Sequence, residues 1–123
     1  MIEYRMESPR AKHLHSMTSQ LVADVVLYPT EAGGRKIPAE LGWGFPCCPS
    51  KSLPLFGVDA WPLLGDTPLL PGERRRIGFV FLGGEKAADI LRKAGMFYLW
   101  EGRFVGEAVV VAKVKNFAPL LSG

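Results

Sequence analysis

Two cysteines and two histidines are the residues of this chain best suited to nucleophilic or metal chemistry. Cys47 and Cys48 are adjacent, whereas a redox motif normally separates its cysteines by two residues so that a disulfide can form. His13 and His15 are separated by one residue, and no further group of ligands in the sequence has the spacing of a metal site. We therefore expect free thiols, solvated histidines and no bound metal.

A nucleotide site would leave a glycine-rich signature. It needs a loop whose backbone amides surround the phosphates, with a lysine and then Ser or Thr directly after the last glycine. Residues 78–86 contain the glycines, but Glu85 separates Lys86 from Gly84 and an alanine follows the lysine. The sequence therefore predicts no nucleotide partner, no cofactor and no enzymatic activity.

Arginines and aromatic residues are the remaining candidates, and the chemistry that they offer is binding. Arg74, Arg75 and Arg76 form a run that could meet phosphates, because a guanidinium fork matches the phosphate oxygens. Trp43 and Phe45 could stack on bases or fill a pocket of a partner. Each group also has a structural alternative: the arginines could form a solvated strand face, and the aromatic residues could pack in the core.

Charge gives limited support to a nucleic-acid partner. The formal net charge is +3, and the whole excess lies in residues 61–123, which hold nine Lys and Arg against six Asp and Glu. Dedicated nucleic-acid binders show a far stronger clustering of positive charge. The excess is compatible with a polyanion but does not require one.

The composition is typical of one small globular domain. The chain has 123 residues, of which 48% are hydrophobic, enough for one core but not two. No apolar run reaches the roughly 18 residues of a membrane span, and residues 1–20 contain charges but no apolar block. With two free thiols, these features predict a cytoplasmic protein without a membrane partner.

Turn residues divide the chain into short elements. The 14 glycines and 10 prolines favour strands joined by turns over long helices. Residues 1–18 show no sustained period and are expected to form a flexible N-terminal arm, with the folded domain over 19–123. We expect strands over residues 21–28, 43–47, 55–59, 74–82, 96–100 and 104–114, and one helix over 85–94.

Two of these segments have a clear period. In the strand over 74–82, Ile77, Phe79 and Phe81 share one face, so the strand is half-buried. In residues 85–94 the period becomes helical, and the expected buried stripe consists of Ala87, Ile90, Leu91 and Ala94, with Gly95 as the C-terminal cap. The prolines between residues 42 and 70 should confine strands there to short edge pieces. Together these patterns predict an all-β fold, a small closed barrel or sandwich with one short helix.

Three motifs occur in an order that resembles a known family. Residues 23–38 contain the turn Glu31-Ala32-Gly33-Gly34-Arg35, residues 95–110 contain the hairpin turn Glu101-Gly102-Arg103, and Pro71-Gly72 lies between them. Their order and spacing, over residues 21–112, resemble the C-terminal β-barrel domain of elongation factor Tu. The resemblance implies a six-stranded antiparallel Greek-key barrel that stands alone, without the GTPase domain that precedes it in the family.

The same resemblance implies binding and no catalysis. In the family this barrel holds the T stem of aminoacyl-tRNA and contacts the nucleotide-exchange factor and the GTPase domain. Gly102 matches a hairpin glycine whose backbone faces the tRNA, with Arg103 beside it, and Gly33, Gly34 and Arg35 match the opening turn.

Two departures from the family pattern change the expected partner. Trp100 replaces an arginine of the family, and residues 43–47 replace its Tyr-Arg-Pro-Gln stretch with Trp-Gly-Phe-Pro-Cys. Apolar side chains thus stand where the family has polar contacts, and aromatic enrichment favours a protein interface.

The resulting expectation is a non-catalytic binding module whose partner is a protein linked to translation. One alternative is a tRNA-binding or RNA-binding module that uses residues 74–76, Arg103, Lys113 and Lys115. A second alternative is an immunity or decoy protein against a toxin that targets elongation factor Tu.

Overall fold

The computed structural model of the chain describes residues 17–111, which form six strands and one helix. The predicted N-terminal arm therefore lies almost entirely outside the described residues, as do His13, His15, Lys113 and Lys115. The elements are β1 (Leu21–Leu27), the 3-10 turn η1 (Thr30–Ala32), β2 (Phe45–Cys48), β3 (Val58–Leu63), β4 (Arg74–Phe81), α2 (Gly84–Ala94), β5 (Met96–Trp100) and β6 (Phe104–Val110).

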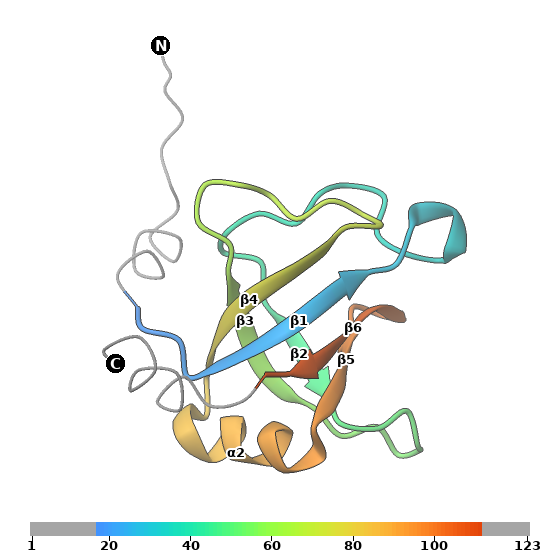
Figure 1. Cartoon of the computed structure of the whole chain (residues 1–123). Helices are drawn as coiled ribbons and strands as arrows, with labels where there is room; N and C mark the ends of the chain where they lie inside the picture. The colour runs from blue at the N-terminus through green and yellow to red at the C-terminus, as the bar shows by residue number, and fades with distance from the viewer. Residues whose placement is uncertain (1–16, 112–123) are drawn as a thin grey trace.

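The strands close into a barrel in the order β1-β4-β3-β2-β5-β6 (Figure 1). Every neighbouring pair is antiparallel. Strands β2, β3 and β4 follow one another as neighbours, and β1 lies beside β4, which is the Greek-key arrangement. The predicted fold class, a small six-stranded antiparallel barrel with one short helix, is confirmed.

Alternation along the strands fills the barrel with apolar side chains. In β1 every second residue from Leu21 to Leu27 is buried, because successive strand side chains point to opposite faces. Phe79 of β4 lies at the centre of the core, with its ring 5.4 Å from Phe97 of β5 and 6.2 Å from Phe45 of β2, both edge-to-face. These contacts connect strands on opposite sides of the barrel.

The proline-rich segment forms its strands later along the chain than predicted, and β2 begins at Phe45 rather than at residue 43. The strand expected over residues 55–59 is instead β3, Val58–Leu63, which contains Pro62, and β2 contains Pro46. The barrel is closed, so neither is an edge strand. Pro62 lies beyond the last β2–β3 pair, and Pro46 lies before the first β2–β5 pair. Each proline thus has no pairing partner on one side of its strand, and on that side a missing amide hydrogen costs little.

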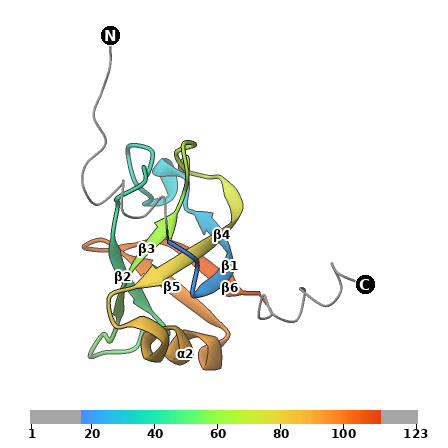
Figure 2. The ribbon, with the colours of Figure 1, turned by 90° about the vertical axis from the view of Figure 1, so that its left-hand side faces the viewer.

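Helix α2 covers one end of the barrel (Figures 1 and 2). Its buried residues are Ala87, Ala88 and Leu91, and Gly95, with φ of 83°, ends it by donating its backbone amide hydrogen to the Leu91 carbonyl. The predicted stripe was wrong at two positions, because Ile90 is 40% exposed and Ala94 is also exposed. The small Ala88 side chain faces the barrel end, which turns Ile90 toward solvent.

The ends of the barrel sequence are held by hydrogen bonds. The Gln20 amide hydrogen is donated to the Phe79 carbonyl, its side-chain oxygen accepts from the Phe81 amide, and its carbonyl accepts from Arg92. Strand β6 ends at Val110, and the part of the predicted 104–114 strand beyond residue 111 lies outside the described residues.

Within residues 17–111 no helix has the length and apolar character needed to cross a membrane.

Candidate functional site

Two turns that resemble each other in sequence contact each other in space. The turn after β1 supplies Arg35, which donates to the Glu101 Oε2 atom at 2.5 Å, and the β5–β6 turn supplies Arg103, which donates to the Gly33 and Gly34 carbonyls at 2.8 and 3.1 Å. The contact is reciprocal, since each turn provides an arginine to the other. We call Gly33, Gly34, Arg35, Trp43, Glu101, Gly102 and Arg103 the turn cluster.

Trp43 completes this cluster. Its Nε1 donates to the same Glu101 Oε2 atom at 2.8 Å, and the Arg35 guanidinium lies 4.5 Å from the centre of its ring. The Arg35 side chain is only 10% exposed as a result. Six of the ten predicted site residues therefore lie together, but the two arginines among them already bind groups of this chain.

Glycine is required in the turn after β1 for two different reasons. Gly33 has φ of 93°, a left-handed conformation that ends η1 and that other residues rarely adopt. A Cβ atom on Gly34 would lie 1.9 Å from the Tyr28 carbonyl oxygen, so the backbone passes too close for any side chain. Gly102 in the β5–β6 turn has φ of 77° and open space around it, so its backbone is accessible.

Phe45 does not belong to this surface. It is 4% exposed and faces the barrel interior, where it packs against Phe79. The Trp43 ring also contacts it, with 4.3 Å between the ring centroids. The prediction that Phe45 contacts a partner is corrected, because strand alternation directs it inward.

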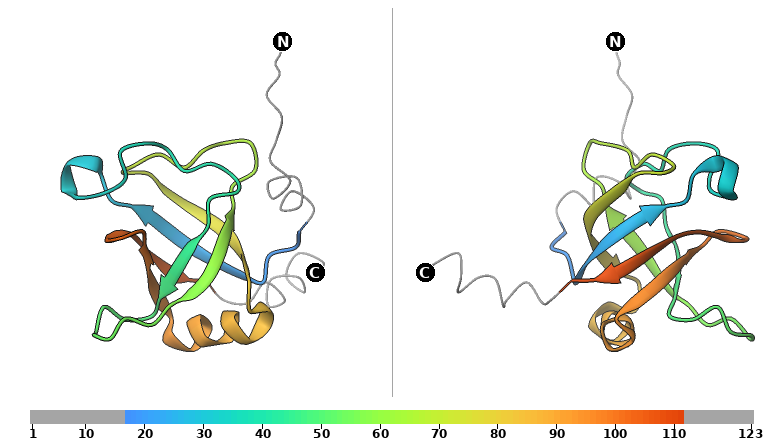
Figure 3. Two further views of the ribbon diagram at one scale, coloured as in Figure 1. Left: turned by 180° about the vertical axis from the view of Figure 1, so that it is seen from behind. Right: turned by 45° about the vertical axis from the view of Figure 1, so that its right-hand side comes forward.

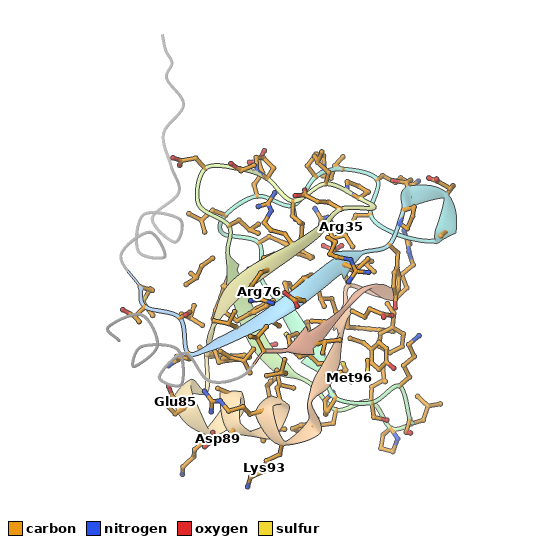
Figure 4. The ribbon with its side chains drawn as sticks, viewed as in Figure 1. Arg35, Arg76, Glu85, Asp89, Lys93 and Met96 are labelled. Carbon is orange, nitrogen blue, oxygen red and sulfur yellow. The ribbon has the colours of Figure 1, made fainter. Side chains whose placement is uncertain are left out.

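The three arginines of β4 lie apart from the turn cluster. Figure 4 shows Arg76 over the middle of β1, whereas Arg35 lies beside the end of that strand. Arg75 donates to Glu73 and to the carbonyls of Thr67 and Pro68, so it holds the loop before β4. Arg74 and Arg76 are exposed on the outer face of the barrel.

The partners of these arginines include two carboxyl groups whose pKa values are shifted. The hydrogen bond from Arg76 holds the pKa of Asp24 below its ordinary value. The backbone amide of Leu70, followed by Arg75, holds the pKa of Glu73 below its ordinary value. Both pairs fit a structural role, since each arginine has a carboxylate of its own.

The described part of the chain carries no net charge. Residues 17–111 contain ten Lys and Arg and ten Asp and Glu, so the formal charge of +3 belongs entirely to the residues on either side. The described residues therefore have no excess of positive charge to attract a phosphate backbone.

Sequence reasoning missed an aromatic group on the outside of the barrel. Tyr98 and Trp100 of β5 point outward, because Phe97 and Leu99 point into the core, and Phe104 of β6 lies between them with ring centroids at 5.7 and 4.9 Å. The Lys51 Nζ atom, from the β2–β3 loop, lies 4.7 Å from the Tyr98 ring and 5.1 Å from the Phe104 ring. We call Lys51, Tyr98, Trp100 and Phe104 the outer aromatic patch.

A signal for this patch was present in the sequence. The segment Met96–Trp100 is apolar at all five positions, whereas a strand with one solvated face alternates apolar and polar residues. The outward positions of β5 therefore needed an explanation that core packing does not supply.

Next to the patch, Tyr28 of β1 donates its hydroxyl hydrogen to Glu107 of β6 at 2.8 Å. Burial and the neighbouring negative charge raise the pKa of Tyr28 to about 12. The Glu107 carboxylate is thus engaged within the barrel wall.

The cysteines have no environment for catalysis. Both are buried, and burial raises the pKa of each thiol, most strongly for Cys47. A nucleophilic cysteine needs the opposite shift, toward the thiolate. Within the described part of the chain, no three His, Cys, Asp or Glu residues are grouped so that they could hold a metal ion.

Comparison with protein-family models and with curated proteins finds no match for this chain. The choice among functions therefore rests on the surface chemistry of the barrel.

Proposed function

We propose that this chain is a non-catalytic protein-binding module, similar in type to the C-terminal barrel of elongation factor Tu, whose partner is a protein linked to translation. The order of the three sequence motifs supports the family assignment, and the six-stranded Greek-key barrel is compatible with it. The proposal does not depend on a GTPase domain, because the module acts by contact alone.

The observation that carries the proposal is that four of the five predicted site arginines, all but the exposed Arg74, already bind groups of this chain. Arg35, Arg75 and Arg76 each pair with a carboxylate, and Arg103 binds two backbone carbonyls. A phosphate backbone would have to displace these partners on a barrel without net charge. Phosphate contacts supply most nucleic-acid affinity, so this surface favours a protein over RNA.

The closed barrel also limits how a partner can bind. All six strands have neighbours on both sides, so no edge within the described residues is open for strand addition. A partner must dock on the outside of the barrel through side chains. Aromatic residues, which are enriched in protein interfaces, are present there in the outer aromatic patch.

The test is affinity capture on the immobilised full chain from a lysate of its source, with and without ribonuclease, and with identification of retained protein and RNA. We expect a discrete protein that survives ribonuclease. In parallel, labelled tRNA is titrated against the free chain at low and physiological salt. Binding of tRNA through phosphate contacts would weaken steeply as salt rises, and we expect no such binding. Retention of tRNA alone, lost with ribonuclease, would overturn the proposal in favour of RNA binding. The identity of the retained protein distinguishes a translation partner from a toxin that targets elongation factor Tu.

A further inference from the structure

We infer that the outer aromatic patch is the docking surface, and that it takes a protein segment presenting apolar side chains next to an aspartate or glutamate. This inference rests on the proposed function and adds to it the place of contact and the chemistry of the partner.

The apolar part of the partner follows from the outward side chains of β5 and β6. Tyr98, Trp100 and Phe104 are half-buried and pack edge-to-face, which fixes their rings in one arrangement. A rigid aromatic group of this kind offers a large contact area without loss of side-chain entropy on binding.

The neighbouring loop extends the apolar surface. The β2–β3 loop lies alongside β5 (Figures 1 and 3), and Lys51 joins it to the rings of β5 and β6. The same loop carries Leu53, which is 85% exposed, and Phe56, which is 53% exposed. Exposed apolar side chains on a loop that contacts a half-buried aromatic group are typical of an interaction surface.

The acidic part of the partner follows from Lys51. In the described residues, the ion pairs join arginines to carboxylates, and Lys51 takes part in none of them. Glu107, which lies opposite Tyr98 in the β5–β6 pairing, already accepts from Tyr28. Once a partner covers the rings, the Lys51 ammonium loses water and needs a negative charge, because an unpaired buried charge is costly. A carboxylate of the partner supplies that charge.

The position of Lys51 also disfavours nucleic-acid bases as occupants. Base stacking needs free ring faces, but the ammonium lies over the Tyr98 and Phe104 rings. A protein segment can instead contact ring edges and leave the cation in place.

The test uses a phage library of random linear peptides, selected on the immobilised full chain. We expect the enriched peptides to combine aliphatic or aromatic residues with Asp or Glu. Against a synthetic peptide from the selection, Lys51→Glu should lower affinity about tenfold or more, the scale of a close charge pair. Replacing the acidic residue of the peptide by lysine should restore binding to the Lys51→Glu variant and weaken binding to the original chain.

Controls separate the patch from the general stability of the chain. Lys51 is an exposed loop residue, so its substitution leaves the core intact, and circular dichroism verifies that each variant is folded. Leu82 is a 71% exposed apolar residue directly after β4, which lies opposite β5 in the closed barrel. Leu82→Ala should leave peptide affinity unchanged. Phe104→Ala should abolish binding.

Three results would overturn the inference: no enrichment of peptides, equal affinity of the selected peptides for the Lys51→Glu variant, or loss of affinity through Leu82→Ala. Failure here is distinguishable from failure of the proposed function. If lysate capture yields a protein that the Phe104→Ala and Lys51→Glu variants retain, the protein-binding function stands and the patch is not its site.

Discussion

Cys47 and Cys48 are adjacent in the sequence, and both thiols are shielded from solvent. Both side chains are buried, with 0% and 2% exposure, and the pKa of each thiol is raised by burial. We predict that neither thiol reacts with Ellman's reagent in the native chain at neutral pH, and that both react at once in denaturant. Rapid reaction of either thiol in the native state would contradict this description and would reopen a redox role.

Tyr28 gives a second prediction at the scale of one residue. Burial, and then the hydrogen bond to Glu107, raise its pKa from 10.0 to about 12. The unfolded chain therefore loses this proton before the folded chain does, so the contribution of Tyr28 to stability is complete below pH 10 and is lost as pH rises through 12.

Ultraviolet absorbance titration of the tyrosines measures this shift, and Tyr28→Phe assigns it. Glu107→Gln should lower the pKa but keep it above the ordinary value, because burial is the larger cause. A native chain whose tyrosines all titrate near the ordinary value would show that the hydroxyl is open to water.

At the scale of elements, the turn after β1 separates two effects of glycine. Gly34→Ala places a methyl group against the Tyr28 carbonyl and should disrupt the turn cluster, whereas Gly33→Ala meets no atom and imposes only backbone strain. We predict a loss of about 1 kcal/mol in the free energy of unfolding for Gly33→Ala and at least twice that for Gly34→Ala. Urea denaturation measures both, and equal losses would mean that the close backbone approach is absent.

Helix α2 offers a matched pair of adjacent residues. Leu91 is fully buried against the barrel end, while Ile90 is 40% exposed. Leu91→Ala should lower the free energy of unfolding by about 2–5 kcal/mol, because it leaves a cavity, and Ile90→Ala should cost much less. Equal losses at both positions in urea denaturation would restore the stripe predicted from the helical period and refute the observed orientation of the helix.

The elements were predicted best where a single pattern controls them. The strand alternation of Ile77, Phe79 and Phe81 and the glycine that ends α2 were correct, because each depends on local chain geometry. The start of β3 and the exposure of Ile90 were wrong, because both depend on how the barrel closes. Proline is excluded from a strand only where its nitrogen faces a paired neighbouring strand, and the sequence does not show where pairing stops.

The candidate site was predicted in part for the same reason. The sequence pointed to the two glycine turns, but their contact through Arg35 and Arg103 is a property of the folded barrel. The outer aromatic patch was missed, although Met96–Trp100 is apolar on both faces, because strand residues alone do not show which face is covered.

At the scale of the whole molecule, the barrel is closed, its described residues carry no net charge, and it has aromatic residues on its outer face. These three properties argue together for a partner that docks by side-chain contact on the outer face of β5 and β6.

The most direct measurement is site-specific photo-crosslinking in cells that express the full chain. Benzoylphenylalanine replaces Tyr98 in one sample and Leu82, on the opposite side of the strand order, in a matched control. The account predicts that illumination joins position 98 to one discrete protein and that position 82 gives no such product. Crosslinking of position 98 to RNA, or equal products from both positions, would contradict it.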